Sequence, residues 1–360
     1  GGSTGGGSTG GGSTGGGSTG GGSGSGGGST GGGSSTGGST GGNSSTGGSG
    51  SGGATANENS KQLLETNLAG LIAVGEAGSM LGSNLDSIVN SVANGGESSG
   101  DAVVYAVSSG NDKKYKTGSH VESKGFGVNV GVAGTHSLSS ADLTTGAFIE
   151  YGRASFETHL DNGLVGKGDT ELIGGGVFAK YQSVGGYYTE GSLRVGKLKT
   201  EADKGLYDEY EISSSYYGAH FGVGKVFALG ASNDLDIYAK YFYSRTQGDE
   251  ITLKGVNVAF DAMSSHKVKF GVKDTMKFSE TSAVYAGLAY QHEFDGDATG
   301  RVSVLNQSAS IASPSLKGAS GIAEVGYTYD SGALKFDIGA KGYAGKERGY
   351  SGNVGLTFRF

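Results

Sequence analysis

Most of the chain after residue 100 alternates apolar side chains with polar or small ones, which is the pattern of β-strands that bury one face. About twelve such runs fall between residues 102 and 360, at about 20 residues for each strand with its loop. This spacing is long for a β-sandwich, where ~8–12 residues is usual. It suits tilted strands of ~10 residues that cross a bilayer. The pattern therefore predicts an all-β, antiparallel transmembrane barrel.

A helical period precedes these strands. Leu64, Leu68, Leu71 and Ile72 fall at i, i+4, i+7 and i+8, which predicts an α-helix over residues 60–81. Such a helix would measure about 33 Å at ~1.5 Å per residue, close to the ~30 Å of a bilayer's hydrocarbon core. Because several glycines and alanines keep the helix thin, we expect it inside the narrow barrel lumen. A helix packed on a soluble core is the alternative.

The first 53 residues are almost entirely Gly, Ser and Thr. Such a tract buries no core and is predicted to be a flexible tether. It carries no charge, so nucleic acid is not an expected partner. We therefore divide the chain into a disordered linker at 1–58, a pore-spanning helix with its linker at 59–96, and a barrel domain at 97–360.

Composition adds two constraints. No stretch reaches ~18 consecutive apolar residues, so no membrane-spanning helix is predicted. The 19 Tyr and 14 Phe gather at strand ends, for example at Tyr187, Tyr188, Tyr241 and Tyr243, which is typical of the aromatic girdles of a membrane barrel. Cross-strand aromatic pairs in a soluble barrel are the alternative. The net charge of −7 and the 0 cysteines do not separate these two interpretations.

The chain printed here ends on an amphipathic strand that contains Val354, Leu356, Phe358 and Phe360. The last strand of a closed barrel pairs with the first, which removes the sheet edge, so we expect these side chains to face lipid. Phe360 resembles the C-terminal recognition signal of bacterial outer-membrane proteins, which the barrel-assembly machinery reads. We therefore expect these four residues to act as an assembly signal.

Several segments, in their order along the chain, resemble the C-terminal translocator domain of autotransporters, the type V secretion proteins. They include SKQLLETNLAGLIAV at the helix, GAFIEYG and YYTEGSLRVGK in the strands, and GAKGYAGKERGYSGNVGLTFRF at the end. The resemblance covers roughly residues 60–360. It implies a monomeric 12-stranded barrel in the lipid of the Gram-negative outer membrane, a helix through the lumen, and an N-terminal passenger carried outside. Lys267 and Lys269 stand where relatives usually have arginines.

Charged residues on the non-apolar face of the predicted strands are expected to line the lumen. They are Glu150, Arg194, Lys240, Lys269, Glu293, Lys335, Asp337, Lys341 and Arg359. Buried charges must be paired or wet, and Glu65 and Glu76 on the helix are the expected partners of wall lysines. The predicted function is export and anchoring of the passenger, with the helix plugging the lumen. A passive porin-like channel and a barrel hydrolase are the alternatives.

Motifs for catalysis, metals or cofactors give no support for an enzyme. The six histidines include no i, i+4 pair and no HExxH, so no metal site is predicted. The chain has no GxxxxGK[ST], so no nucleotide cofactor is predicted either. The remaining candidates for a hydrolase are Asp261 with His266 and His292 with Asp295.

Some autotransporters cut their own passenger inside the barrel, at an asparagine pair near the helix. Here Asn84 and Asn90 stand alone, with Asp86 as a nearby acid. We expect these asparagines to be ordinary polar surface, and no cleavage is predicted from them.

Overall fold

The computed structural model describes residues 54–93, 102–207, 209–305 and 307–359. Most of the predicted linker, the predicted segment 94–96 and Phe360 lie outside the described residues. The elements are β1 (Ala54–Thr55), η1 (Glu58–Ser60), α1 (Lys61–Ala93), β2 (Ala102–Lys116), β3 (His120–Leu138), β4 (Ala141–His159), β5 (Val165–Ser183), β6 (Tyr187–Lys204), β7 (Tyr210–Ala228), β8 (Asn233–Thr246), β9 (Asp249–Leu253), β10 (Val256–Phe260), β11 (Met263–Lys277), β12 (Ser282–Glu293), β13 (Gly300–Val304), β14 (Gln307–Ser310), β15 (Gly318–Asp330), β16 (Leu334–Gly345) and β17 (Glu347–Arg359).

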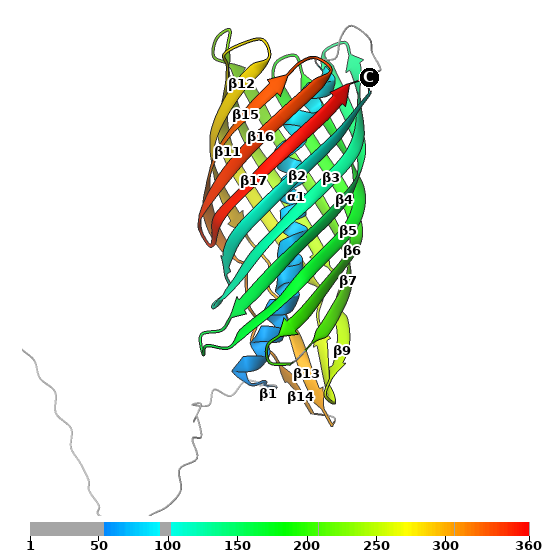
Figure 1. The fold of residues 1–360 in the computed structure, drawn as a ribbon, viewed down its shortest axis with the longest axis vertical. Helices are drawn as coiled ribbons and strands as arrows, with labels where there is room; N and C mark the ends of the chain where they lie inside the picture. The colour runs from blue at the N-terminus through cyan, green and yellow to red at the C-terminus, as the bar shows by residue number, and fades with distance from the viewer. Residues whose placement is uncertain (1–53, 94–101, 208, 306, 360) are drawn as a thin grey trace, which may run out of the picture. The chain divides into compact units, whose positions relative to one another are not determined.

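Twelve of the described strands close into an antiparallel barrel, in the order β2 to β8, β11, β12, β15, β16 and β17 (Figure 1). The barrel closes where β17 pairs with β2, for example Leu356 opposite Ala106. Val354 and Phe358 on this last strand face outward and are exposed. The predicted 12-stranded antiparallel barrel is confirmed.

The two rims of the barrel differ. At one rim, named here the short-turn rim, tight turns join β3 to β4, β5 to β6, β7 to β8, β11 to β12 and β15 to β16. At the other, the long-loop rim, the connections from β8 to β11 and from β12 to β15 carry the extra strands β9, β10, β13 and β14. These strands form a separate sheet in the order β1-β14-β13-β10-β9, which extends beyond the barrel (Figure 1).

Helix α1 runs through the interior of the barrel (Figure 1). It has 33 residues, or about 50 Å at 1.5 Å per residue, so it includes most of the predicted residues 60–81 and continues beyond them to Ala93. Leu85, Ile88, Val89 and Val92 continue the apolar stripe at i, i+3, i+4 and i+7 and are buried against the wall. This packing outweighs the low helix propensity of Gly82 and its neighbours. No helix in the described part of the chain is long and apolar enough to cross a membrane.

Residues 54–58 take part in the fold, although the sequence analysis assigned them to the linker. β1 pairs in parallel with β14, and the Asn57 side-chain oxygen accepts the backbone N–H of Asn59 at 2.9 Å. Strand β1 and Asn57 lie within residues 1–58, which the sequence analysis assigned to the linker. No sign of this strand is visible in the sequence, because a two-residue segment that pairs with a strand more than 200 residues away is too short to show alternation.

Candidate functional site

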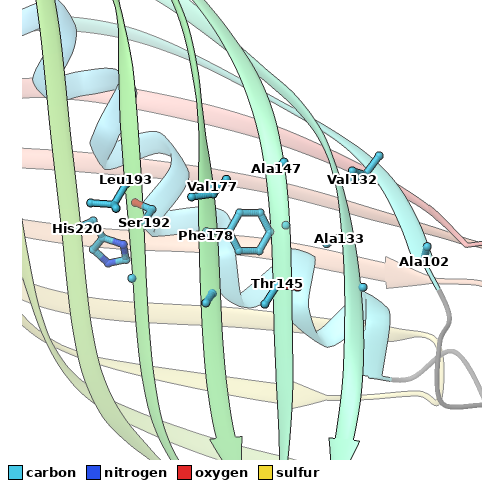
Figure 2. Close-up of a pocket in the computed structure, with 14 residues that line it drawn as sticks. Ala102, Val132, Ala133, Thr145, Ala147, Val177, Phe178, Ser192, Leu193 and His220 are labelled. Atoms are coloured by element: carbon cyan, nitrogen blue, oxygen red, sulfur yellow. The ribbon is translucent and has the colours of Figure 1, made fainter.

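The outer wall of the barrel is apolar and the inner wall is polar. Large apolar side chains that face outward include Phe126, Val132, Ile149, Ile173, Leu193, Phe221, Phe270, Leu288, Val325 and Ile338. Small outward residues between them leave a depression of about 800 Å³ over β2 to β7, and α1 lies behind this part of the wall (Figure 2). A wide apolar surface exposed in this way is typical of a region that contacts lipid or a partner.

The charged residues predicted to line the lumen all lie in strands of the barrel wall. Arg194 and Lys240 are almost fully buried, and both reach the helix. The Arg194 guanidinium contacts Glu150 at 3.1 Å and donates to the backbone carbonyl of Val74. Lys240 donates to the carbonyl of Gly82 at 2.8 Å. The inner wall therefore binds the helix backbone as well as its side chains.

The same arrangement recurs towards the short-turn rim. The Lys335 ammonium donates to the carbonyl of Ser87 at 2.9 Å. The Arg359 side chain donates to the carbonyl of Ser91 and to Asp330 at 2.6 Å. A carbonyl oxygen has a second lone pair beyond its helical hydrogen bond, so these contacts do not unwind the helix.

Other predicted lumen residues pair within the wall. Lys341 lies 3.4 Å from Glu324, and Asp337 accepts from Thr328 at 3.1 Å. Glu293 accepts from Ser265 at 2.6 Å. The ammonium of Lys269 lies 5.6 Å from the centre of the Phe242 ring.

Glu76 on α1 pairs with a wall lysine, as the sequence suggested. Its carboxylate lies 2.7 Å from the Lys113 ammonium and accepts the hydroxyl of Tyr115 at 2.9 Å. Lys113 also lies 2.7 Å from Glu347, which accepts from Gln291 at 2.9 Å. Lys113 is 2% exposed, so its charge depends on these two carboxylates.

The expectation for Glu65 is wrong, because no described wall lysine pairs with its carboxylate. Glu65 accepts the hydroxyl of Thr117 at 2.6 Å and that of Ser119. The cation nearest to it is Lys61 of the helix itself, at 3.9 Å. Hydroxyl donors of the β2–β3 turn are not distinguishable in sequence from ordinary turn residues.

The largest ionic cluster of the lumen centres on Asp86, which the sequence analysis treated only as a possible acid for cleavage. The Asp86 carboxylate contacts Lys180, lies 3.3 Å from Lys273, and lies 3.9 Å from Lys240. The ammonium of Lys240 also lies 2.7 Å from the carboxylate of Glu190. Three strands thus direct lysines at one helix carboxylate.

The apolar helix residues named from the sequence contact two surfaces. Leu64, Leu68 and Leu71 lie in one cluster with Val258 and Phe260 of the small sheet, among other residues. Ile72 packs in a second cluster with Tyr115, Val121 and Phe156 of the barrel wall. The small sheet was not predicted, because its strands β9, β10 and β13 have only 5 residues each and β14 has 4, too few to show a clear alternation.

The remaining chemical candidates are not assembled into a catalytic pair. Among the described residues, no hydrogen bond joins Asp261 to His266 or Asp295 to His292; Asp261 accepts from Thr299 at 2.9 Å, and His266 contacts the Tyr241 hydroxyl at 2.7 Å. Asn84 donates to the helix carbonyl of Met80 at 2.8 Å. The described geometry offers no acid–base pair at any of these positions.

The small size of two helix residues permits the close approach of helix and wall. A Cβ atom at Gly82 would lie 2.7 Å from the Phe242 ring, and one at Gly78 would lie 3.0 Å from the Arg194 guanidinium. At Gly75 a Cβ atom would meet nothing within 4 Å. Residues with side chains at 78 and 82 would therefore push the helix off this wall.

Alanine at Gly82 and alanine at Gly75 should therefore change the stability of the barrel in opposite directions. Gly82→Ala should lower the stability of the folded barrel by about 1–3 kcal/mol through overpacking, although alanine favours a helix. Gly75→Ala should raise it by about 0.5–1 kcal/mol through helix propensity alone. Urea unfolding in lipid vesicles, followed by tyrosine fluorescence, measures both values. Equal shifts for the two variants would mean that the helix does not touch Phe242.

Comparison with known proteins places most of the barrel in one family. The model of the autotransporter beta-domain family matches residues 93–341. The autotransporter CRAC of Citrobacter rodentium (strain ICC168) is 26% identical over 165 residues, which cover 44% of this chain and 10% of that protein. The autotransporter adhesin/invasin TibA of Escherichia coli O78:H11 is 24% identical over 165 residues, which cover 44% of this chain and 16% of that protein. The matches thus span only a small part of these relatives.

Solved structures show the same fold. The beta domain of the Bordetella autotransporter BrkA has a TM-score of 0.58 at 18% identity, over 71% of this chain and 98% of that one. The transport unit of the autotransporter AIDA-I from Escherichia coli has a TM-score of 0.58 at 14% identity, over 77% of this chain and 98% of that one. Since the family match covers more than half of the sequence, this chain belongs to the autotransporter beta-domain family, whose barrels reside in the bacterial outer membrane.

Proposed function

We propose that this barrel exports an N-terminal passenger segment across the outer membrane and anchors it there, while α1 stays in the lumen as a plug. The observation that carries the proposal is the continuous contact between α1 and the wall. Ion pairs at Glu76 and Asp86, and side chains that donate to the carbonyls of Gly82 and Ser87, hold the helix along its length.

The direction of export follows from the two rims. The N-terminal end of α1 lies at the long-loop rim, where Glu65 binds the β2–β3 turn, and its C-terminal end lies near β17, where Ser91 binds Arg359. Transmembrane barrels have short periplasmic turns and longer extracellular loops. A chain that continues N-terminally from α1 therefore leaves the barrel on the extracellular side.

The proposal includes three partners. Outer-membrane lipid would cover the apolar outer wall. The barrel-assembly machinery would read the last strand, which contains Val354, Leu356 and Phe358, together with Phe360. The passenger would be the segment N-terminal to α1, beginning with the Gly/Ser/Thr tract. One chain closes the barrel by itself, which supports a monomer.

The passive-channel alternative receives less support from the packing. Two cavities between helix and wall, lined among others by Met80 and by Gly78, measure about 30 and 10 Å³. On this measure a cavity needs about 10–15 Å³ to hold one water molecule. Cavities of this size therefore have no room for an ordinary solute.

Surface labelling tests the proposed direction. Because the chain contains 0 cysteines, a single introduced cysteine reports its own side of the membrane. We expect Ser45→Cys, in the tract, to react in intact cells with a maleimide that does not cross the outer membrane. Ser232→Cys, in the β7–β8 turn of the short-turn rim, is the control and should react only after lysis. Labelling of Ser232→Cys but not of Ser45→Cys in intact cells would reverse the orientation.

A further inference from the structure

Two histidines lie opposite each other on the outside of the barrel, at the long-loop rim. His120 begins β3 and His159 ends β4, and the two residues are paired in register. Their neighbours Val121 and Thr158 are fully buried and point into the lumen. Because side chains alternate along a strand, both imidazoles face outward. The next residues on that face of β3 are Glu122 and Lys124, so the site lies beyond the apolar band.

The geometry of this pair is close to that of a metal site. The two imidazole rings stack with centroids 4.5 Å apart and planes 14° from parallel. The Glu122 carboxylate lies 3.6 Å from Nε2 of His120. One donor atom from each of His120, His159 and Glu122 lies within 4.8 Å of the other two. Three side chains thus bring metal-binding atoms close enough together for one ion.

His159 has a second carboxylate nearby, since its Nε2 lies 3.6 Å from Glu157. Nε2 of His159 is buried and has no hydrogen-bond partner among the described residues. An unpaired buried polar atom costs free energy, so its persistence calls for a ligand.

One neighbouring group opposes a bound cation. The Lys114 ammonium lies 3.1 Å from Glu122. Its side chain is 43% exposed, so it can turn into solvent at little cost, because an exposed ion pair contributes at most about 1 kcal/mol. The cation does not need to displace any buried group.

We propose that His120, His159 and Glu122 bind a divalent transition-metal ion of the zinc class. Two imidazoles and one carboxylate favour zinc or copper over the hard cations magnesium and calcium. Zinc binds such ligands at about 2.0–2.2 Å with tetrahedral geometry, which places donor atoms about 3.3 Å apart. Rotation of the two rings out of their parallel stack would turn their nitrogens towards one ion, with water in the fourth position.

The metal would add a bond between two turns whose histidine side chains already stack on each other. His120 follows the β2–β3 turn, and His159 precedes the β4–β5 turn. The first of these turns carries Thr117 and Ser119, which hold Glu65 of α1. A bound ion would therefore fasten the rim at the place where the helix enters the lumen.

Zinc titration of the full, tag-free chain, refolded in detergent micelles and read with a competing fluorescent chelator, tests the proposal. The 0 cysteines exclude binding by thiols. We expect one zinc ion per chain. Loss of a residue that merely orients a metal ligand weakens binding by about 10–100-fold, so His120→Ala and His159→Ala should each weaken it by at least about tenfold.

The matched control is His136→Ala, which removes an exposed histidine from the same face of β3, near the other rim. It should bind zinc as the unsubstituted chain does. Glu122→Gln keeps the side-chain shape and should also weaken binding, which guards against misfolding of the alanine variants. Zinc should raise the melting temperature of the unsubstituted chain, and EDTA should reverse the rise. Absence of binding, or equal binding by His120→Ala and His136→Ala, overturns the proposal.

Discussion

Asp86→Ala is expected to destabilise the folded barrel by about 3–5 kcal/mol, the range found when one partner of a buried ion pair is removed. The carboxylate of Asp86 lies among the ammonium groups of Lys180, Lys240 and Lys273. Lys180 and Lys240 keep Glu190 as a second partner. Lys273 has no other described ion pair within 4 Å. Its ammonium group would therefore be left unpaired, and this accounts for most of the lost stability.

The measurement is the temperature at which the folded form converts to the unfolded form on an electrophoretic gel. Asn90→Ala is the control, because Asn90 lies on the same helix but is exposed, and it should change this temperature little. Adding Lys273→Met to Asp86→Ala removes the stranded charge and should recover part of the loss. An Asp86→Ala chain as stable as the Asn90→Ala chain would show that the lumen is wet enough to solvate the three lysines.

The barrel was predictable from the sequence because the alternation of apolar and polar residues depends only on positions within each strand. A strand with lipid on one side and a polar lumen on the other must alternate, so residues such as Lys335, Phe336, Asp337 and Ile338 reveal their faces from spacing alone. The charged wall residues followed from the same rule. The apolar period, by contrast, predicted the helix over residues 60–81, whereas α1 continues to Ala93, with Leu85 and Ile88 packed among apolar residues of the wall.

The contacts made by each side chain were less predictable, since they depend on register and on which wall face the helix meets. Glu76 was recognised as an ion-pair partner, but Lys113 was not named among the lumen residues. The scan for metal ligands tested spacing along one element, whereas His120 and His159 meet across two strands at a separation of 39 positions. A search for histidines at equal distances from a predicted hairpin turn would have found this pair.

Removing α1 is expected to convert the barrel into an open pore. A chain that lacks residues 61–93 loses the helix whose contacts leave gaps of only about 30 and 10 Å³ at the two cavities described. Single-channel recording in planar bilayers should show a steady conductance that the intact chain lacks. Lys180, Lys240 and Lys273 would then face the pore without Asp86, and a ring of lysines favours anions, so the open state should prefer chloride over potassium.

Deletion of residues 1–50 is the matched control, because it shortens the chain and leaves the helix in place. This shorter chain should conduct no more than the intact one. The helix-deleted chain must still migrate as a folded form on unheated gels, so that conductance is compared between folded barrels. If the folded, helix-deleted barrel conducts no more than the intact one, α1 does not plug the lumen. If the intact chain already shows a large steady conductance, the protein is a passive channel. In that case the helix leaves the lumen in a membrane, and its ion pairs with Lys113 and Lys273 are broken there.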